Sequence, residues 1–300
     1  MNTHFFIEVL IGGLLSGVMY ALVALGFVLV YKASGVFNFA QGAMVFFAAL
    51  TCVGMTEKFA LPLWLAISVT MLLMVALGLA IERVVLRPLV NQPEITLFMA
   101  TIGLSFFIEG LAQLLWGSQP HQLSLPIEDV PIAWLLEKYN INVSQFDLTA
   151  ALICALLVAV LALIFSKTKI GRALRAVADD QQAALAAGIP SQQIWGMVWA
   201  AAGFLALVAG LLWGARNGVQ FALTFVALKA LPVLIVGGFT SVPGAVVGGL
   251  LIGASEKLAE VYIGPLVGGG IEGWFPYVLA LLFLLVRPEG MFGEKVIRRI

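Results

Sequence analysis

The chain has 300 residues, of which 62% are hydrophobic and 11% are charged, and its mean hydropathy is +1.06. Soluble globular domains carry about 25% charged residues, so the composition excludes an ordinary soluble domain and is typical of an integral membrane protein. The formal net charge is zero, and the sequence contains no stripe of basic residues of the kind that binds nucleic acid. Cys52 and Cys154 fall inside apolar runs, and His4 and His121 are isolated, so we expect no disulfide framework, metal site or cofactor.

Nine apolar runs follow one another along the chain, and a transmembrane helix needs about 20 such residues. The first six are free of charge apart from Glu109, whereas Lys229, Glu256 and several glycines interrupt the last three. The first run is too long for a cleavable signal peptide and lacks a basic segment before it. We expect an all-α polytopic transmembrane helical bundle of about 8–9 spans, with seven spans and a re-entrant pair as the alternative. The predicted spans are 9–31, 33–56, 59–81, 95–116, 148–166, 191–215, 221–238, 242–259 and 273–286.

The positions of lysine and arginine predict the orientation of this bundle, because short cytoplasmic loops carry more of them than external loops. With alternating spans, eleven of the 16 basic residues fall on one side and four on the other, while Lys229 lies inside a span. We therefore expect the N-terminus outside and the C-terminus in the cytoplasm. Lys169 and Arg298 should be cytoplasmic, whereas Glu128 and Lys138 should be external.

The cytoplasmic loop 167–190 contains the polar stretch GRALRAVADDQQAALAAGIP. Asp179 and Asp180 are suitable N-cap residues for a short helix over 181–187. Gly188 suits the C′ position that ends such a helix. A helix of about two turns is too short to be stable alone in water, so it must rest on its own membrane domain, together with a preceding turn over 172–178, or in the cleft of a separate protein. The alternative is a solvated connector whose basic residues only set the topology.

Polar and charged residues within the predicted spans are candidates for the pathway, because a polar group is expensive to bury there. Asn38 and Gln41 lie on adjacent turns near the cytoplasmic end of the second span. We expect them either to hydrogen-bond between helices or to line the transport pathway. Glu109 and Lys229 are strongly charged, and for them an ion pair or snorkelling towards the interface is favoured over contact with a substrate.

Glycine spacing indicates how the helices pack. Two glycines four residues apart place a flat patch on one helix face, where a second backbone can approach closely. We expect such patches to form close helix contacts, and the sequence contains them at Gly13 with Gly17, Gly244 with Gly248, and Gly249 with Gly253.

The sequence lacks the motifs of nucleotide hydrolysis and of hydrolytic enzymes. No GxxxxGK stretch followed by Ser or Thr occurs, so the chain does not bind ATP by a phosphate loop. Neither GxSxG nor HExxH occurs. We therefore expect no enzyme, with any ATP hydrolysed by a separate polypeptide. An ion-coupled secondary transporter is the second interpretation, although no inverted repeat is evident, and a structural membrane protein is the third.

Several stretches resemble a known family. The polar loop resembles the coupling loop of ABC-importer permeases, in which a short helix docks on the ATPase subunit. Three further stretches are similar to branched-chain amino-acid permeases of the LivH type, and the similarity covers nearly the whole chain. They are GLLSGVMYALVALGFVLVYKASGVFNFAQGAMV (13–45), GGFTSVPGAVVGGLLIG (237–253) and VRPEGMFG (286–293). Where the family commonly reads NFAHGE, this chain reads NFAQGA over 38–43.

The resemblance implies a single permease domain over 1–300 in a bacterial-type inner membrane, serving an ABC importer. It implies as partners ABC ATPase subunits, a second permease subunit that is homologous or identical, an extracytoplasmic solute-binding protein and membrane lipid. Branched-chain amino acids are the leading substrates, with urea, amides or other small polar solutes as alternatives. Ala184 would face the ATPase cleft and Gln182 the solvent. The residues of the coupling loop would be Arg172, Arg175, Asp179, Asp180, Ala184 and Gly188, with Asn38 and Gln41 as pathway candidates.

Overall fold

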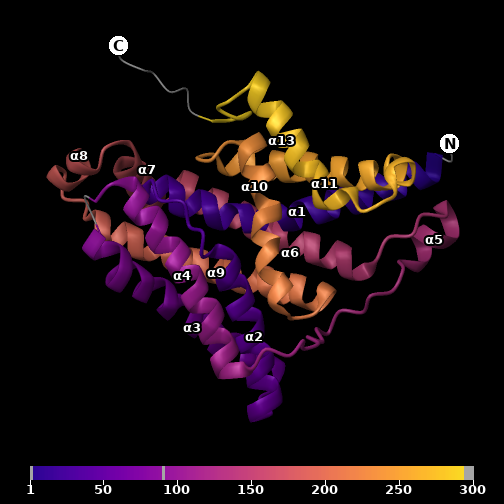
Figure 1. Ribbon diagram of the computed structural model, residues 1–300, viewed down its shortest axis with the longest axis horizontal. Helices are drawn as coiled ribbons and strands as arrows, with labels where there is room; N and C mark the ends of the chain where they lie inside the picture. Colours follow the sequence, from indigo (N-terminus) through magenta and orange to yellow (C-terminus); the bar gives the residue numbers. More distant parts are fainter. Residues whose placement is uncertain (1–2, 90–91, 294–300) are drawn as a thin grey trace. The chain divides into compact units, whose positions relative to one another are not determined.

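The computed structural model describes residues 3–89 and 92–293, and the regular elements in that part of the chain are helices (Figure 1). Two isolated β-bridges join His121 to Val219 and Pro131 to Ser144. The predicted all-α bundle is confirmed. The α-helices are α1 (Thr3–Ser34), α2 (Gln41–Phe59), α3 (Leu63–Ala80), α4 (Glu94–Trp116), α5 (Ala133–Tyr139), α6 (Gln145–Lys167), α7 (Lys169–Asp179), α8 (Gln181–Ala186), α9 (Ser191–Asn217), α10 (Val226–Gly237), α11 (Val242–Tyr262), α12 (Gly264–Val267) and α13 (Phe275–Val286). Four shorter elements are the π-helix η1 (Ile81–Leu86) and the 3-10 helices η2 (Arg87–Leu89), η3 (Phe221–Phe225) and η4 (Ile271–Gly273).

Seven helices in the described residues are long and apolar enough to cross a membrane, and two further apolar helices are shorter. Each of the nine predicted runs corresponds to one of them. The shorter two are Phe221–Gly237, which begins as a 3-10 turn and contains Pro232, and Phe275–Val286. Twelve helical residues extend about 18 Å, less than the ~30 Å hydrocarbon core of a bilayer. The orientation of the termini stays a prediction, and Arg298 lies outside the described residues.

The chain forms two compact units, and α1, α6 and α10 each continue from one into the other. The α11 unit comprises Met1–Ala24, Leu125–Val160 and Lys229–Ile300. The α2 unit comprises Leu25–Ser124 and Leu161–Leu228. The single permease domain expected over the whole chain stays a prediction.

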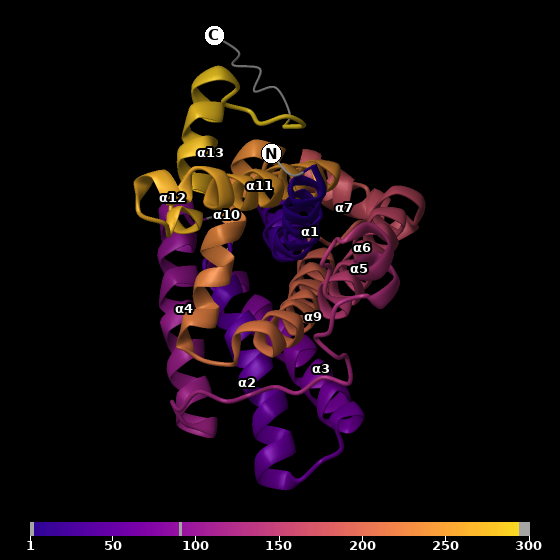
Figure 2. The ribbon, with the colours of Figure 1, turned by 90° about the vertical axis from the view of Figure 1, so that its right-hand side faces the viewer.

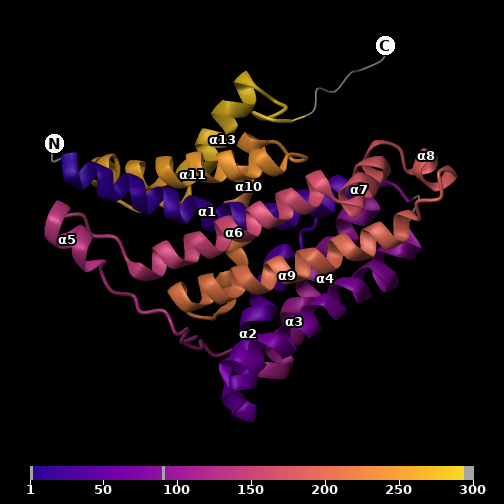
Figure 3. The same cartoon turned by 180° about the vertical axis from the view of Figure 1, so that it is seen from behind.

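In the α2 unit, α2 is the buried centre. Its residues from Gln41 to Gly54 are all buried, and α3, α4 and α9 pack against it (Figure 3). Where α3 meets α9, a Cβ at Gly203 would lie 2.5 Å from the carbonyl oxygen of Met74. The two backbones therefore touch, which is how close-packed membrane helices gain van der Waals contact.

In the α11 unit, α1 and α11 meet through the glycine faces that the sequence predicts. A Cβ at Gly13 would lie 2.7 Å from the carbonyl oxygen of Gly253, and side chains at Gly17 and Gly249 would overlap the carbonyl oxygen of the opposite glycine. The remaining predicted pair, Gly244 with Gly248, also lies on α11 and faces α10 in the same way. The close packing expected at all three pairs is confirmed.

The loop that follows α13 folds back over the end of α10. Met291 N donates to Val236 O at 2.8 Å and Phe292 N donates to Gly237 O at 3.1 Å, so two helix-end carbonyls that have no partner within the helix are satisfied. Gly290 has a φ of +80°, and a Cβ there would lie 2.7 Å from the backbone nitrogen of Gly238. The VRPEGMFG motif is thus a cap for α10.

Candidate functional site

The loop between α6 and α9 folds as two short helices, α7 and α8, near the start of α9 (Figure 3). Gly171, Leu174 and Val177 recur every three residues along α7 and are buried. Arg172 and Arg175 lie on its exposed face. This one-sided burial holds α7 against its own unit and presents the arginines to solvent.

The structure corrects the extent of α7, because the sequence predicted only a turn over 172–178. The helix has 11 residues, and its first turn is capped by Thr168, whose hydroxyl accepts from Gly171 N at 3.2 Å. Arg175 Nη1 donates to Phe165 O at 2.7 Å, near the end of α6. The apolar stripe and this cap stabilise a full helix, and both signals are weaker in the sequence than the charges that surround them.

The predicted caps of α8 are confirmed in part. The Asp180 side chain accepts from the backbone nitrogens of residues 182 and 183, both at 2.9 Å, whereas Asp179 is the last residue of α7 and does not cap α8. Gly188 has a φ of +81°. Its nitrogen donates to Leu185 O at 3.0 Å and Ile189 N donates to Ala184 O at 2.9 Å, which is the Schellman arrangement.

The structure also corrects the direction in which Ala184 points. Its side chain is 3% exposed and faces the chain's own fold, whereas Leu185 is 51% exposed and Gln182 is exposed. A six-residue helix needs a buried contact to be held in place, and Ala184 supplies it. The surface that α8 offers to a partner is therefore the face of Leu185 and Gln182, which we call the α8 face.

A hollow of about 440 Å³ lies beside the α8 face, and Gln181, Leu185 and Trp195 are among the residues that line it. Gln181 Nε2 donates to Ser191 Oγ at 3.2 Å, which joins α8 to the first residue of α9. One turn further along α9, Trp195 Nε1 donates to the carbonyl oxygen of Ala33 at 3.0 Å. A displacement of α8 therefore acts on the start of α9 and, through the indole, on the end of α1.

Asn38 and Gln41 are both 0% exposed. Asn38 Nδ2 donates to Gln41 Oε1 at 3.0 Å, Asn38 Oδ1 accepts from Ala40 N at 3.1 Å, and Gln41 Nε2 donates to Ala202 O of α9 at 3.5 Å. Gly26 leaves the room for this amide, because a side chain at that position would overlap Gln41 Nε2. These contacts are those of a polar cluster between packed helices, and a role in lining the pathway stays a prediction.

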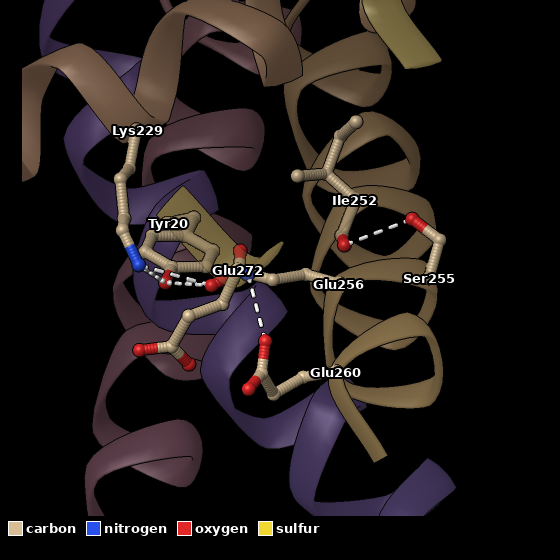
Figure 4. A network of polar contacts seen from close by, with 7 residues as sticks. All are labelled: Tyr20, Lys229, Ile252, Ser255, Glu256, Glu260 and Glu272. Atoms are coloured by element: carbon tan, nitrogen blue, oxygen red, sulfur yellow. Dashed lines mark hydrogen bonds and ion pairs between the residues drawn. The ribbon is translucent and has the colours of Figure 1, made fainter. Parts of the chain in front are cut away.

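Glu109 and Lys229, the two charged residues singled out from the sequence, have different surroundings. Glu109 accepts from Ser105 Oγ at 3.2 Å within α4. Lys229 forms an ion pair with Glu256, with 3.0 Å between Nζ and Oε1, and both groups contact Tyr20 (Figure 4). Neither Tyr20 nor the pairing with Glu256 was predicted from the sequence. The available signal was an opposite charge in the next predicted span.

Comparison with known proteins identifies the family. A family model described as "Branched-chain amino acid transport system / permease component" matches residues 9–287. The chain belongs to this family. The LivH permease of Salmonella typhimurium, named for high-affinity branched-chain amino acid transport, is 27% identical over 99% of this chain and 98% of its own length. The BraD permease of Pseudomonas aeruginosa, named for the same transport, is 29% identical over 99% of both chains. A fructose import permease, FruF of Bifidobacterium longum, is 26% identical over 79% of this chain and 66% of its own.

Membership of the branched-chain amino acid permease family makes this chain a permease subunit of an ABC importer. Such permeases are multi-pass proteins of the inner membrane, in agreement with the seven long apolar helices. The homologues are transport permease subunits. The family motifs also have structural places here, since one contains the Asn38–Gln41 cluster and another caps α10.

Proposed function

We propose that this chain forms part of the membrane passage through which an ABC importer moves branched-chain amino acids into the cell, while separate subunits hydrolyse ATP. The observation that carries this proposal is the α8 face. A helix of six residues is capped at both ends and exposes a leucine in a polar loop. Such a helix suits a cleft in a second protein.

The partners follow from what the chain contains. Its sequence has no phosphate-loop motif, so ATP binding by that route requires another polypeptide. We propose two ATPase subunits that receive the α8 face, a second permease subunit that is identical or homologous, and an extracytoplasmic protein that delivers the solute.

The substrate assignment rests on the relatives. LivH and BraD are named for branched-chain amino acids, which supports leucine and similar solutes as the cargo. FruF is named for fructose, which supports other small polar solutes, such as urea or amides, as the alternative.

Leucine uptake tests the proposal directly. Cells that produce this chain with its ATPase subunits, second permease and binding protein should accumulate radiolabelled leucine. Uptake should disappear when the phosphate-loop lysine of the ATPase is replaced, because that lysine contacts the nucleotide phosphates. Leucine uptake that persists with the inactive ATPase would instead indicate ion coupling. ATP hydrolysis by the isolated chain would contradict the proposal that separate subunits hydrolyse ATP.

The proposed orientation places the α8 face in the cytoplasm. A cysteine introduced at Lys169 should be protected from an impermeant thiol reagent in intact cells, whereas cysteines at Glu128 and Lys138 should react. Labelling at 169 with protection at 128 would invert the topology.

A further inference from the structure

Three polar side chains from three helices converge inside the α11 unit (Figure 4). Tyr20 comes from α1, Lys229 from α10 and Glu256 from α11. Lys229 Nζ donates to Glu256 Oε1 at 3.0 Å and to the Tyr20 hydroxyl at 3.4 Å, and that hydroxyl donates to the same carboxylate oxygen at 3.1 Å. Lys229 Nζ also lies 5.9 Å from the centre of the Tyr20 ring.

The three side chains do not satisfy all of each other's hydrogen-bonding groups. Glu256 Oε1 takes both hydrogen bonds, while its second oxygen, Oε2, is buried without a hydrogen-bond partner among the described residues. Glu256 is 4% exposed, whereas the side chain of Lys229 is 31% exposed. An ammonium group has three donors, and the two bonds from Lys229 leave one more. The network therefore has a buried acceptor and a partly accessible donor to offer.

A purely structural ion pair gives no reason for Glu256 Oε2 to be buried without a partner among the described residues. In an apolar surrounding, charged groups are stabilised when each of their polar atoms has a partner. Glu260, one turn further along α11, illustrates a completed carboxylate. Its Oε1 accepts from Gly270 N at 3.0 Å and its Oε2 accepts from Glu272 N at 2.9 Å, where η4 turns back beside α11 (Figure 2).

Close-packed glycines fix the spacing of the three groups. Tyr20 lies three residues after Gly17, and Glu256 lies three residues after Gly253, so each side chain shares a helix face with a glycine of the α1–α11 contact. Lys229 stands on α10, whose backbone touches α11 at the glycine pair next to it. A site held by touching backbones is preorganised for its ligand.

We propose that Tyr20, Lys229 and Glu256 form a binding site for the charged head group of an amino acid in transit. The proposal rests on the amino-acid substrate proposed above. Lys229 binds the carboxylate of the solute, and Glu256 Oε2 accepts from its ammonium group. Tyr20 holds the Lys229 and Glu256 side chains in position through its hydroxyl. A sugar or urea carries neither charge, so it would leave the buried oxygen without an ionic partner.

A comparison of single and double neutral variants separates a binding site from a structural ion pair. In the complete transporter, Lys229→Met and Glu256→Gln should each lower leucine uptake about tenfold or more, because each removes a charge-assisted hydrogen bond to the solute. The double variant Lys229→Met/Glu256→Gln leaves no unpaired charge. It should reach the membrane and bind its ATPase at wild-type levels, yet its leucine uptake should stay as low.

A second measurement identifies how the double variant fails. Its ATPase activity should still rise when leucine-loaded binding protein is added, so that the ATP hydrolysed per leucine moved increases about tenfold or more, in line with the lost charged contacts. A double variant that recovers wild-type uptake overturns the binding site and leaves only an ion pair. Joint loss of stimulated ATPase activity and uptake also overturns it, because the defect is then structural.

The wild-type transporter distinguishes this inference from the proposed function. If it moves leucine and the double variant does too, the binding site is wrong and the amino-acid importer stands. If the wild type moves fructose or urea and no amino acid, both are wrong.

Discussion

The α8 face and the network of Tyr20, Lys229 and Glu256 are opposite in chemistry and alike in one respect. In the polar loop, an apolar side chain is exposed, since Leu185 is 51% accessible. In the apolar helices, a carboxylate oxygen is buried without a partner among the described residues. Each place displays the kind of group that its surroundings disfavour. The difference indicates two kinds of contact, with a protein cleft at the loop and with a charged solute within the helices.

Substitution of Leu185 should be among the changes with the largest effect on transport. Leu185→Arg should lower uptake and ATPase co-purification at least about tenfold, equivalent to a loss of ~1.4 kcal/mol of contact, with normal membrane insertion. Ala184→Arg should do the same for a different reason, because an arginine at a buried position displaces α8. Gln182→Glu also lies on the α8 face, but it is exposed and changes little in size, so its effect should be mild compared with that of Leu185→Arg. Normal transport by Leu185→Arg with its ATPase still bound would make α8 a simple connector.

The network should be most sensitive to removal of its cation. Lys229→Met leaves Glu256, which is 4% exposed, without its counter-charge. Loss of one partner of a buried pair destabilises by about 3 kcal/mol or more, and the partial exposure of Lys229 favours the lower end. Unfolding of the purified chain in detergent should show this decrease. Glu256→Gln should destabilise less, because the remaining lysine side chain is 31% exposed and keeps its hydrogen bond to Tyr20.

The double variant Lys229→Met/Glu256→Gln is the control for this loss of stability. It should return to within about 1 kcal/mol of the wild-type free energy of unfolding, because it contains no uncompensated buried charge. An equal loss of stability in the double variant would show that the side chains contribute packing rather than charge.

Both places differ in how far the sequence could predict them. The loop depends on neighbours, since the Asp180 cap and the turn at Gly188 use residues within five positions. Sequence rules for helix ends therefore found them. The face was harder to predict, because the burial of Ala184 depends on contacts that α8 makes beyond its own residues. In the network, Tyr20 and Glu256 are 236 positions apart, and no local pattern brings them together.

The span pattern was predictable because the bilayer requires long apolar runs. All nine runs correspond to apolar helices. The close contacts of the glycine pairs were predictable too, because a spacing of four residues places both glycines on one helix face. The last run was already short in the sequence, at 273–286, and in the structure its helix begins at Phe275, after η4 ends at Gly273.

Substitution of a glycine at the α1–α11 contact should have a smaller effect on stability and tests what holds the network in place. Gly17→Ala places a methyl group against the carbonyl oxygen of Gly249, so α1 must move away from α11 and Tyr20 away from Glu256. Overpacking of this kind destabilises by about 2 kcal/mol. Gly12→Ala is the matched control, because a Cβ there meets nothing within 4 Å and alanine is the better helix former. The midpoint temperature of thermal unfolding in detergent should therefore fall for Gly17→Ala and stay level or rise for Gly12→Ala.

The smallest effect concerns the cap of α8, which holds the α8 face in place. Asp180→Ala removes the acceptor of two backbone N–H groups and should destabilise the helix by about 1 kcal/mol. Local opening should then become about fivefold more frequent, which hydrogen exchange at the amides of 182–189 measures. Asp180→Asn keeps a capping oxygen and should exchange like the wild type, and Asp179→Ala should do so too because Asp179 ends α7. Equal protection in Asp180→Ala would mean that the buried Ala184 contact alone holds α8, and the exposed leucine would then owe its position to packing on α9 rather than to the cap.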